Sequence, residues 1–322
     1  MSAIFITNGD VNVKQIFKSP AWTAVFAVLC NMLWGSAYPG VKLGYEAFGV
    51  TDTPQKLLFA GLRFLIAGAI VLAVSIPISK RTPKLTKKNA PMILLTALIY
   101  TAVQYVFFYI GLSNTTGTNG SIVNSTTTFM AVILSHFVYK NDKITAPRLV
   151  GTCIGFAGVL VVCFGGSVSF SLTGEGFILI AALCFVIGSM LSKRASTGSD
   201  AFTVTGFNLL FGGALLTLLG FAFGGRLAAV TPFGIANLLY LALLSAAAFT
   251  IWTMLLKYNS VASISVYNFI IPVFGTLLSA LLLNENILEL KYLVSLILVS
   301  AGIIIVNTGT LKRHSLQTGG KK

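Results

Sequence analysis

Three side chains that are able to bind a charged solute recur at helical spacing near the N-terminus. Trp34, Tyr38 and Lys42 lie at positions i, i+4 and i+8, so they share one face of a helix. An ammonium group beside two aromatic rings binds a carboxylate while the rings stack on the rest of the solute. The lysine also has a structural option, in which it extends to the membrane surface or pairs with Glu46. Both options stay open at this point.

A second cation, Arg63, stands inside an apolar run. A charge at that depth needs a water-filled cavity, a partner or a lipid headgroup. We predict either an anion clamp, which makes Arg63 part of the solute site, or a structural pair with Glu46 or with carbonyls at a helix end. Asn208 stands at the equivalent position of a later, similar segment and is a further polar candidate.

Small polar residues form a third group of candidates. Asn124 and Thr128 share one helix face, and the later similar segment carries Asn268 and Pro272 at the same places. Because proline lacks an N–H, the carbonyl of Asn268 is predicted to be free. We interpret these residues as two halves of a polar cavity wall; the alternative is that they join membrane helices through hydrogen bonds.

Other polar and aromatic residues complete the prediction. His136, the only histidine in a predicted membrane segment, is either a proton site or an interface group. The sequence has no aspartate or glutamate in the middle of a predicted helix, no phosphate-binding loop and no metal-ligand spacing, so it predicts neither an enzyme nor a cofactor. The predicted solute-binding residues are Trp34, Tyr38, Lys42, Arg63, Gln104, Tyr105, Asn124, Thr128, Asn208, Trp252, Tyr267 and Asn268.

The composition indicates which solvent surrounds the elements that position these residues. Of the 322 residues, 56% are hydrophobic and 9% are charged, and mean hydropathy is +0.88. A soluble domain carries about 25% charged residues, so a soluble enzyme, a disordered chain and a secreted disulfide scaffold are all excluded. Four cysteines lie in apolar runs and are predicted to be small buried residues: Cys30, Cys153, Cys163 and Cys184.

The apolar runs are long enough for membrane-spanning helices, which need about 20 residues each. The sequence predicts an all-α integral membrane protein with ten transmembrane helices. They are expected at 21–44, 57–79, 90–112, 118–139, 147–166, 175–193, 201–224, 232–256, 260–283 and 288–308.

The distribution of positive charge predicts the orientation. The net charge is +14, and most of the 22 lysines and arginines fall in connections on the side of the two termini. This asymmetry predicts that both termini are cytoplasmic in a multi-pass protein of the cell membrane, and it explains the basic character without nucleic acid. The predicted partners are a small-molecule substrate and the lipid bilayer, with a homodimer as a further option.

The chain contains an internal repeat. A shift of 144 residues aligns 112–162 with 256–306, and a shift of 145 aligns 61–65 with 206–210. Five helices per repeat is an odd number, so the second copy must be inverted across the membrane, as in many transporters. We predict two inverted five-helix repeats around a central cavity. Their boundaries are 21–166 and 175–308, between a tail at 1–20 and a basic tail at 309–322.

Short motifs follow one another in a defined order: Trp34-Gly35-Ser36 with Lys42, Leu62-Arg63-Phe64-Leu65-Ile66-Ala67, Tyr258 to Ser265, Pro272, Asn284-Glu285-Asn286 and Ala301-Gly302. Over residues 20–310 this order resembles the EamA-type family of the drug/metabolite transporter superfamily. The sequence departs from the family at Thr128, where proline is frequent, and at Lys140-Asn141-Asp142, where a Gly-Glu pair is common.

The resemblance implies a ten-helix exporter with a central cavity, in which helices 147–166 and 288–308 are peripheral. Its implied cargo is an amino acid, a derivative or a related organic zwitterion or anion, moved by alternating access. Two alternatives stay open. One is an exchanger of the sugar-phosphate or nucleotide-sugar type, and the other is a membrane protein that handles lipid.

Overall fold

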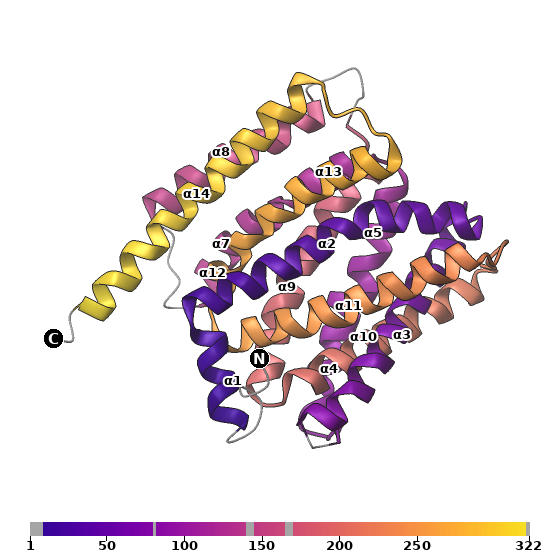
Figure 1. The fold of residues 1–322 in the computed structure, drawn as a ribbon, viewed down its shortest axis with the longest axis horizontal. Coiled ribbons are helices and arrows are strands. Elements are labelled where there is room, and N and C mark those ends of the chain that lie inside the picture. Colours follow the sequence, from indigo (N-terminus) through magenta and orange to yellow (C-terminus); the bar gives the residue numbers. More distant parts are fainter. Residues whose placement is uncertain (1–8, 80–81, 140–144, 165–169, 320–322) are drawn as a thin grey trace.

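We analysed a computed structural model, which describes residues 9–79, 82–139, 145–164 and 170–319. Over these residues the chain is helical and has no strand (Figure 1). The elements are α1 (Gly9–Lys18), α2 (Pro20–Phe48), α3 (Thr53–Ser79), α4 (Ala90–Thr96), η1 (Ala97–Val103), α5 (Gln104–Ser113), α6 (Gly117–Asn124), α7 (Thr126–Val138), α8 (Ala146–Phe164), η2 (Leu172–Gly176), α9 (Phe177–Thr197), α10 (Ala201–Ala222), α11 (Pro232–Tyr258), α12 (Val261–Ser265), η3 (Val266–Phe269), α13 (Ile270–Leu283) and α14 (Leu290–Gly319).

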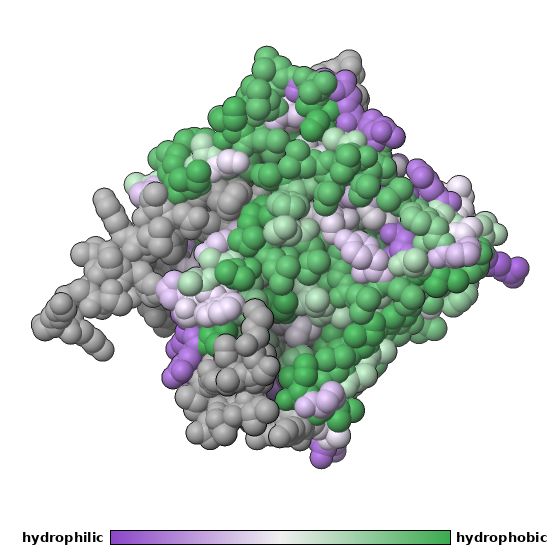
Figure 2. Space-filling model, in the orientation of Figure 1, coloured by the Kyte–Doolittle hydropathy of each residue, from purple (hydrophilic) through white to green (hydrophobic). Residues whose placement is uncertain are grey.

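Eight of these segments are long and apolar enough to cross a membrane. The remaining two predicted spans correspond to α8 and α14, whose apolar stretches Leu149–Val161 and Leu290–Gly302 are shorter. Figure 2 shows hydrophobic residues over most of one face of the bundle, with hydrophilic residues mainly near its margins. Because only apolar side chains are compatible with acyl chains, this surface confirms the prediction of an all-helical multi-pass membrane protein.

Three predicted helices are interrupted, which corrects the sequence-based boundaries. Segment 118–139 is divided into α6 and α7 at Ser125, and segment 260–283 contains the 3₁₀ turn η3. Pro272 explains the second break, because its ring displaces the carbonyl four residues earlier. Near the first break, the Thr126 hydroxyl donates to the Val123 carbonyl at 2.8 Å and competes with the helical ladder. Segment 90–112 contains a π-helical stretch, η1.

Glycines bring α3 and α10 into backbone contact. A Cβ added to Gly68 would lie 2.5 Å from the Leu210 nitrogen, and a Cβ added to Gly213 would lie 2.5 Å from the Leu65 nitrogen. Only glycine permits so close an approach of two membrane helices. The two contacts are reciprocal, because the 145-residue shift relates Gly68 to Gly213 and Leu65 to Leu210.

The outer helices and the tails complete the bundle. α8 and α14 pack on each other along one edge (Figure 1). The predicted tail 1–20 contains a helix, α1, which is fixed by its last turn. Phe17 stacks on Phe26 at 4.9 Å, and its carbonyl accepts a hydrogen bond from Asn259 Nδ2 at 2.8 Å. Most of the predicted C-terminal tail continues α14 as helix.

The prediction that all cysteines are buried is correct only for Cys30, whose thiol donates to the Ala248 carbonyl. Cys153 is exposed and Cys184 is half-buried, because neighbouring helices do not fully cover their side chains. The side chain of Cys163 lies outside the described residues.

Candidate functional site

An aromatic cluster fills the middle of the bundle. Trp34 makes edge-to-face contacts with Phe185, Phe249 and Trp252 at centroid distances of 5.3, 5.5 and 5.1 Å. The Trp252 ring donates through Nε1 to Ser189 Oγ at 3.4 Å. The Trp34 ring is 7% exposed, and its Nε1 has no hydrogen-bond partner. A buried donor is therefore left unsatisfied at the centre.

A second aromatic layer continues the cluster along α2 and α5. Tyr38 makes an edge-to-face contact with Phe108 at 5.4 Å, and Tyr105 lies 4.2 Å from the ring of Phe64. Gln104 is buried beside them, and its Oε1 has no partner.

The polar residues of the interrupted helices bond across the bundle. Asn268 is fully buried and donates through Nδ2 to Thr127 Oγ1 at 3.2 Å, whereas its Oδ1 has no partner. The Thr128 hydroxyl donates to the Ser265 carbonyl at 2.9 Å. The predicted free carbonyl of Asn268 is wrong, because the Ile270 N–H at the end of η3 donates to it.

The remaining polar candidates lie around this crossing. Asn124 ends α6 and is half-buried, as is Tyr267 in η3. Asn208 is buried in α10, where its Oδ1 accepts a hydrogen bond from the Thr101 hydroxyl at 3.2 Å. Asn31, one turn before Trp34, was missed by the sequence analysis. It is fully buried and its Oδ1 has no partner.

Arg63 is 1% exposed and bonds to α11 and α5 rather than to an acid. Its Nε donates to Ser245 Oγ at 2.8 Å and to the Leu241 carbonyl at 3.2 Å, and its Nη1 donates to the Tyr109 hydroxyl at 3.1 Å. The predicted pair with Glu46 or with helix-end carbonyls is wrong, because the carbonyl that it contacts lies inside α11. Among the described residues no carboxylate pairs with this guanidinium.

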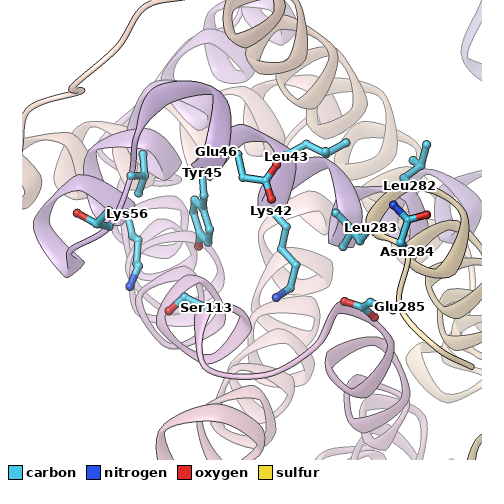
Figure 3. A pocket seen from close by; sticks show the side chains of 12 residues that line it. Lys42, Leu43, Tyr45, Glu46, Lys56, Ser113, Leu282, Leu283, Asn284 and Glu285 are labelled. Carbon is cyan, nitrogen blue, oxygen red and sulfur yellow. The ribbon is translucent and has the colours of Figure 1, made fainter.

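The cavity that the structure describes lies at the end of the bundle where α2 and α13 end, with a volume of about 530 Å³. Figure 3 shows charged side chains from three segments around it: Lys42 and Glu46 of α2, Lys56 of α3, and Glu285 just after α13. Of the twelve predicted residues, Lys42 alone lines this cavity, and the other eleven lie deeper in the bundle. The aromatic cluster around Trp34 occupies the middle of the described bundle, where the sequence predicted a central cavity.

Lys42 contacts the turn between α5 and α6. Its Nζ donates to the Thr115 carbonyl at 2.8 Å, and the predicted ion pair with Glu46 is absent among the described residues. The carboxylates of Glu285 and Glu46 are the opposite charges that act on the Lys42 ammonium. The lysine therefore faces the cavity and is held by a backbone carbonyl, not by a carboxylate.

Two carboxylates that the sequence analysis left without a role hold the same turn. Glu285 accepts from the backbone N–H groups of Gly117 at 2.7 Å and Thr118 at 2.8 Å, which are the first donors of α6. Glu175 is 4% exposed and accepts from the Thr115 hydroxyl and from Asn119 Nδ2. Its other oxygen accepts from the Ser171 N–H at 3.0 Å, and the Ser171 hydroxyl accepts from the Gly174 N–H at 3.0 Å, so these two side chains cap the start of η2.

Comparison with known proteins identifies the relatives of this bundle. The sequence is 27% identical to the uncharacterized transporter YvbV of Bacillus subtilis over 95% of this chain and 98% of the relative. It is also 27% identical to the uncharacterized inner membrane transporter YedA of Escherichia coli K12, over 89% and 90% of the two chains. One solved crystal structure, 18% identical, has a TM-score of 0.70 over 90% of this chain and 98% of the other, which shows the fold.

The EamA-like transporter family matches the sequence twice, over residues 21–164 and 172–308. The relatives carry the names of transporters rather than of enzymes. The two matches together cover most of the chain, including the interrupted segments 118–139 and 260–283 and the cavity. This multi-pass membrane protein therefore belongs to the EamA-like transporter family.

Proposed function

We propose that this protein is a secondary transporter that exports a small organic zwitterion or anion, such as an amino acid or a derivative, across the cell membrane. The observation that carries the proposal is the set of unsatisfied polar atoms in the middle of the bundle: Asn31 Oδ1, Trp34 Nε1, Gln104 Oε1 and Asn268 Oδ1. Each buried polar atom without a partner costs about 1–3 kcal/mol. A cargo that bonds to them during transport accounts for their presence.

The chemistry of these atoms favours one class of cargo. Three amide oxygens accept hydrogen bonds, which suits an ammonium or hydroxyl group, and the indole N–H donates one. The Lys42 ammonium at the cavity supplies the complement for a carboxylate. The surrounding aromatic rings offer flat apolar surface for the rest of the cargo. A molecule with both an amine and a carboxylate therefore meets complementary groups at successive depths of the bundle, at Lys42 and at the deeper amides.

Transport by alternating access is supported by the relation between the two halves. In our proposal the ten helices form two inverted repeats with both termini in the cytoplasm, and the repeats rock around the aromatic cluster. The repeat relates α3 to α10 and α8 to α14, and the two members of each pair pack on each other. It also relates the contact of α6 with α13 to the contact of α12 with α7. Such reciprocal packing is expected of two halves related by a pseudo-two-fold axis.

Metabolite profiling tests the proposal directly. Cells that express the protein should accumulate outside a carboxylate-bearing metabolite that cells with the Lys42→Ala variant retain. Proteoliposomes should then transport that compound with saturable kinetics, and Lys42→Ala should lower the rate at least tenfold, because it removes a charge-assisted hydrogen bond. Lys291→Ala is the matched control, since this lysine pairs with Glu289 at the surface.

Two outcomes contradict the proposal. Equal export by the Lys42→Ala variant removes Lys42 from the cargo site. Export of no metabolite, together with flipping of labelled lipid in proteoliposomes, replaces a transporter of water-soluble cargo with a lipid-handling protein.

A further inference from the structure

Lys193, near the end of α9, bonds to a turn in the opposite half of the sequence from Lys42. Its Nζ donates to the Leu256 carbonyl at 2.7 Å and to the Asn259 carbonyl. Both carbonyls belong to the end of α11, and Asn259 begins the turn into α12. The ammonium therefore ties α9 to the turn from which an interrupted helix starts.

This arrangement repeats that of Lys42. Lys42 and Lys193 each lie near the end of the first helix of a predicted repeat. Each donates to a carbonyl in the turn before an interrupted helix, Thr115 in one half and Asn259 in the other. The 144-residue shift relates Thr115 to Asn259. Both lysines thus make the same kind of contact in their own halves, although they are 151 residues apart rather than 144.

The residue after each contact also has the same role in both halves. The Thr116 hydroxyl caps α6 by accepting from the Asn119 N–H at 2.9 Å, and the Ser260 hydroxyl accepts from the Ser263 N–H at 3.2 Å at the start of α12. The same shift relates these two pairs. The two halves therefore share the capping hydrogen bond of this turn as well as its sequence.

The two turns lie at opposite ends of the bundle. Asn259 contacts Phe17 beside the first residues of α2, whereas Lys42 contacts Thr115 near the last residues of α2. α2 has 29 residues, which at 1.5 Å per residue separates its ends by about 43 Å. The length matches the thickness of a bilayer with its headgroups.

We propose that Lys42 and Lys193 are a pair of equivalent gate residues, one at each end of the transport path. Each ammonium donates to the carbonyl of the residue before the capping hydroxyl, Thr115 or Asn259, and so fixes the interrupted helix that follows. To open one end of the transport path, the interrupted helix at that end must move away. The lysine at that end must then release its turn, while the lysine at the other end keeps its hydrogen bond. The inference rests on the proposed alternating access and adds Lys193, which the cargo site does not include.

The two gates differ at one related position. Glu285 holds the start of α6 through two backbone N–H groups at the Lys42 end. Its counterpart under the 144-residue shift is Asn141, which is neutral and lies outside the described residues.

Thiol labelling in the membrane tests the pair without any knowledge of the cargo. In a chain whose four cysteines are replaced by alanine, Ser192→Cys reports the Lys193 end and Thr118→Cys reports the Lys42 end, because both residues are buried. When Lys193→Gln is added, the cysteine of Ser192→Cys should be labelled about tenfold faster, as expected for the loss of one charge-assisted hydrogen bond. The cysteine of Thr118→Cys should be labelled more slowly. Lys42→Gln should have the opposite effect on both reporters.

The controls separate gating from loss of structure. Arg194→Gln and Arg226→Gln remove the same charge from an exposed side chain at each end of the bundle and should leave both reporters unchanged. Lys193→Arg should restore slow labelling. If Lys193→Gln accelerates both reporters, or changes neither, the pairing of the gates is refuted. Because labelling is read without cargo, reciprocal labelling with no measurable transport would overturn only the proposed function.

Discussion

The carboxylate of Glu285 joins the end of α13 to the start of α6, and its removal has a calculable effect. One oxygen accepts from the Gly117 N–H at 2.7 Å and the other from the Thr118 N–H at 2.8 Å. These donors are among the first N–H groups of α6, which have no partner within the helix. In the variant Glu285→Gln, only one side-chain oxygen remains as an acceptor, and the negative charge at the helix N-terminus is lost.

The magnitude follows from the number of bonds. A hydrogen bond to a charged group contributes about 1.5–3 kcal/mol, and Glu285→Gln loses at least one such bond. Since each 1.4 kcal/mol is a factor of about ten, local opening of the α6 start should increase about 10- to 150-fold. The side-chain NH2 group of the glutamine cannot replace the lost oxygen, because it is a hydrogen-bond donor and would face a backbone N–H, which is also a donor.

Hydrogen–deuterium exchange of the purified protein measures this opening. Peptides that contain the start of α6 should lose protection by the stated factor, whereas peptides from α3 and α10 should be unchanged. Glu289→Gln is the matched control, because its carboxylate pairs with Lys291 at the surface and such pairs contribute about 0–1 kcal/mol. Unchanged exchange in α6 of the Glu285→Gln variant would refute the reasoning.

Three further substitutions distinguish structural from cargo-binding roles. Arg63→Met leaves the hydrogen-bond partners of a buried guanidinium unpaired and should destabilise the protein by about 3–5 kcal/mol in thermal unfolding; lost transport at an unchanged melting temperature would instead assign Arg63 to the cargo. Trp34→Phe removes an unsatisfied donor and should raise the melting temperature while it raises KM for the cargo, and an unchanged KM would exclude the indole N–H from binding. Gly213→Val forces α10 away from α3 and should abolish the yield of folded protein; normal yield in detergent would show that the close backbone contact is dispensable.

The sequence by itself determined the class of the protein. Transfer of a side chain into lipid depends mainly on its own chemistry, so hydropathy located the membrane helices without knowledge of their neighbours. The repeat and the motifs led to the EamA-like family because they depend on order along the chain.

Only the tertiary structure decided which polar groups meet. Arg63 could be placed on a helix but not paired, because its partners Leu241 and Ser245 lie on α11, far along the chain. Glu285 and Lys193 could be counted as charges, but their contacts with two interrupted helices depend on where each turn lies in depth. That depth is set by close packing between helices, such as the glycine contact of α3 with α10, and packing of this kind has no local signature in the sequence.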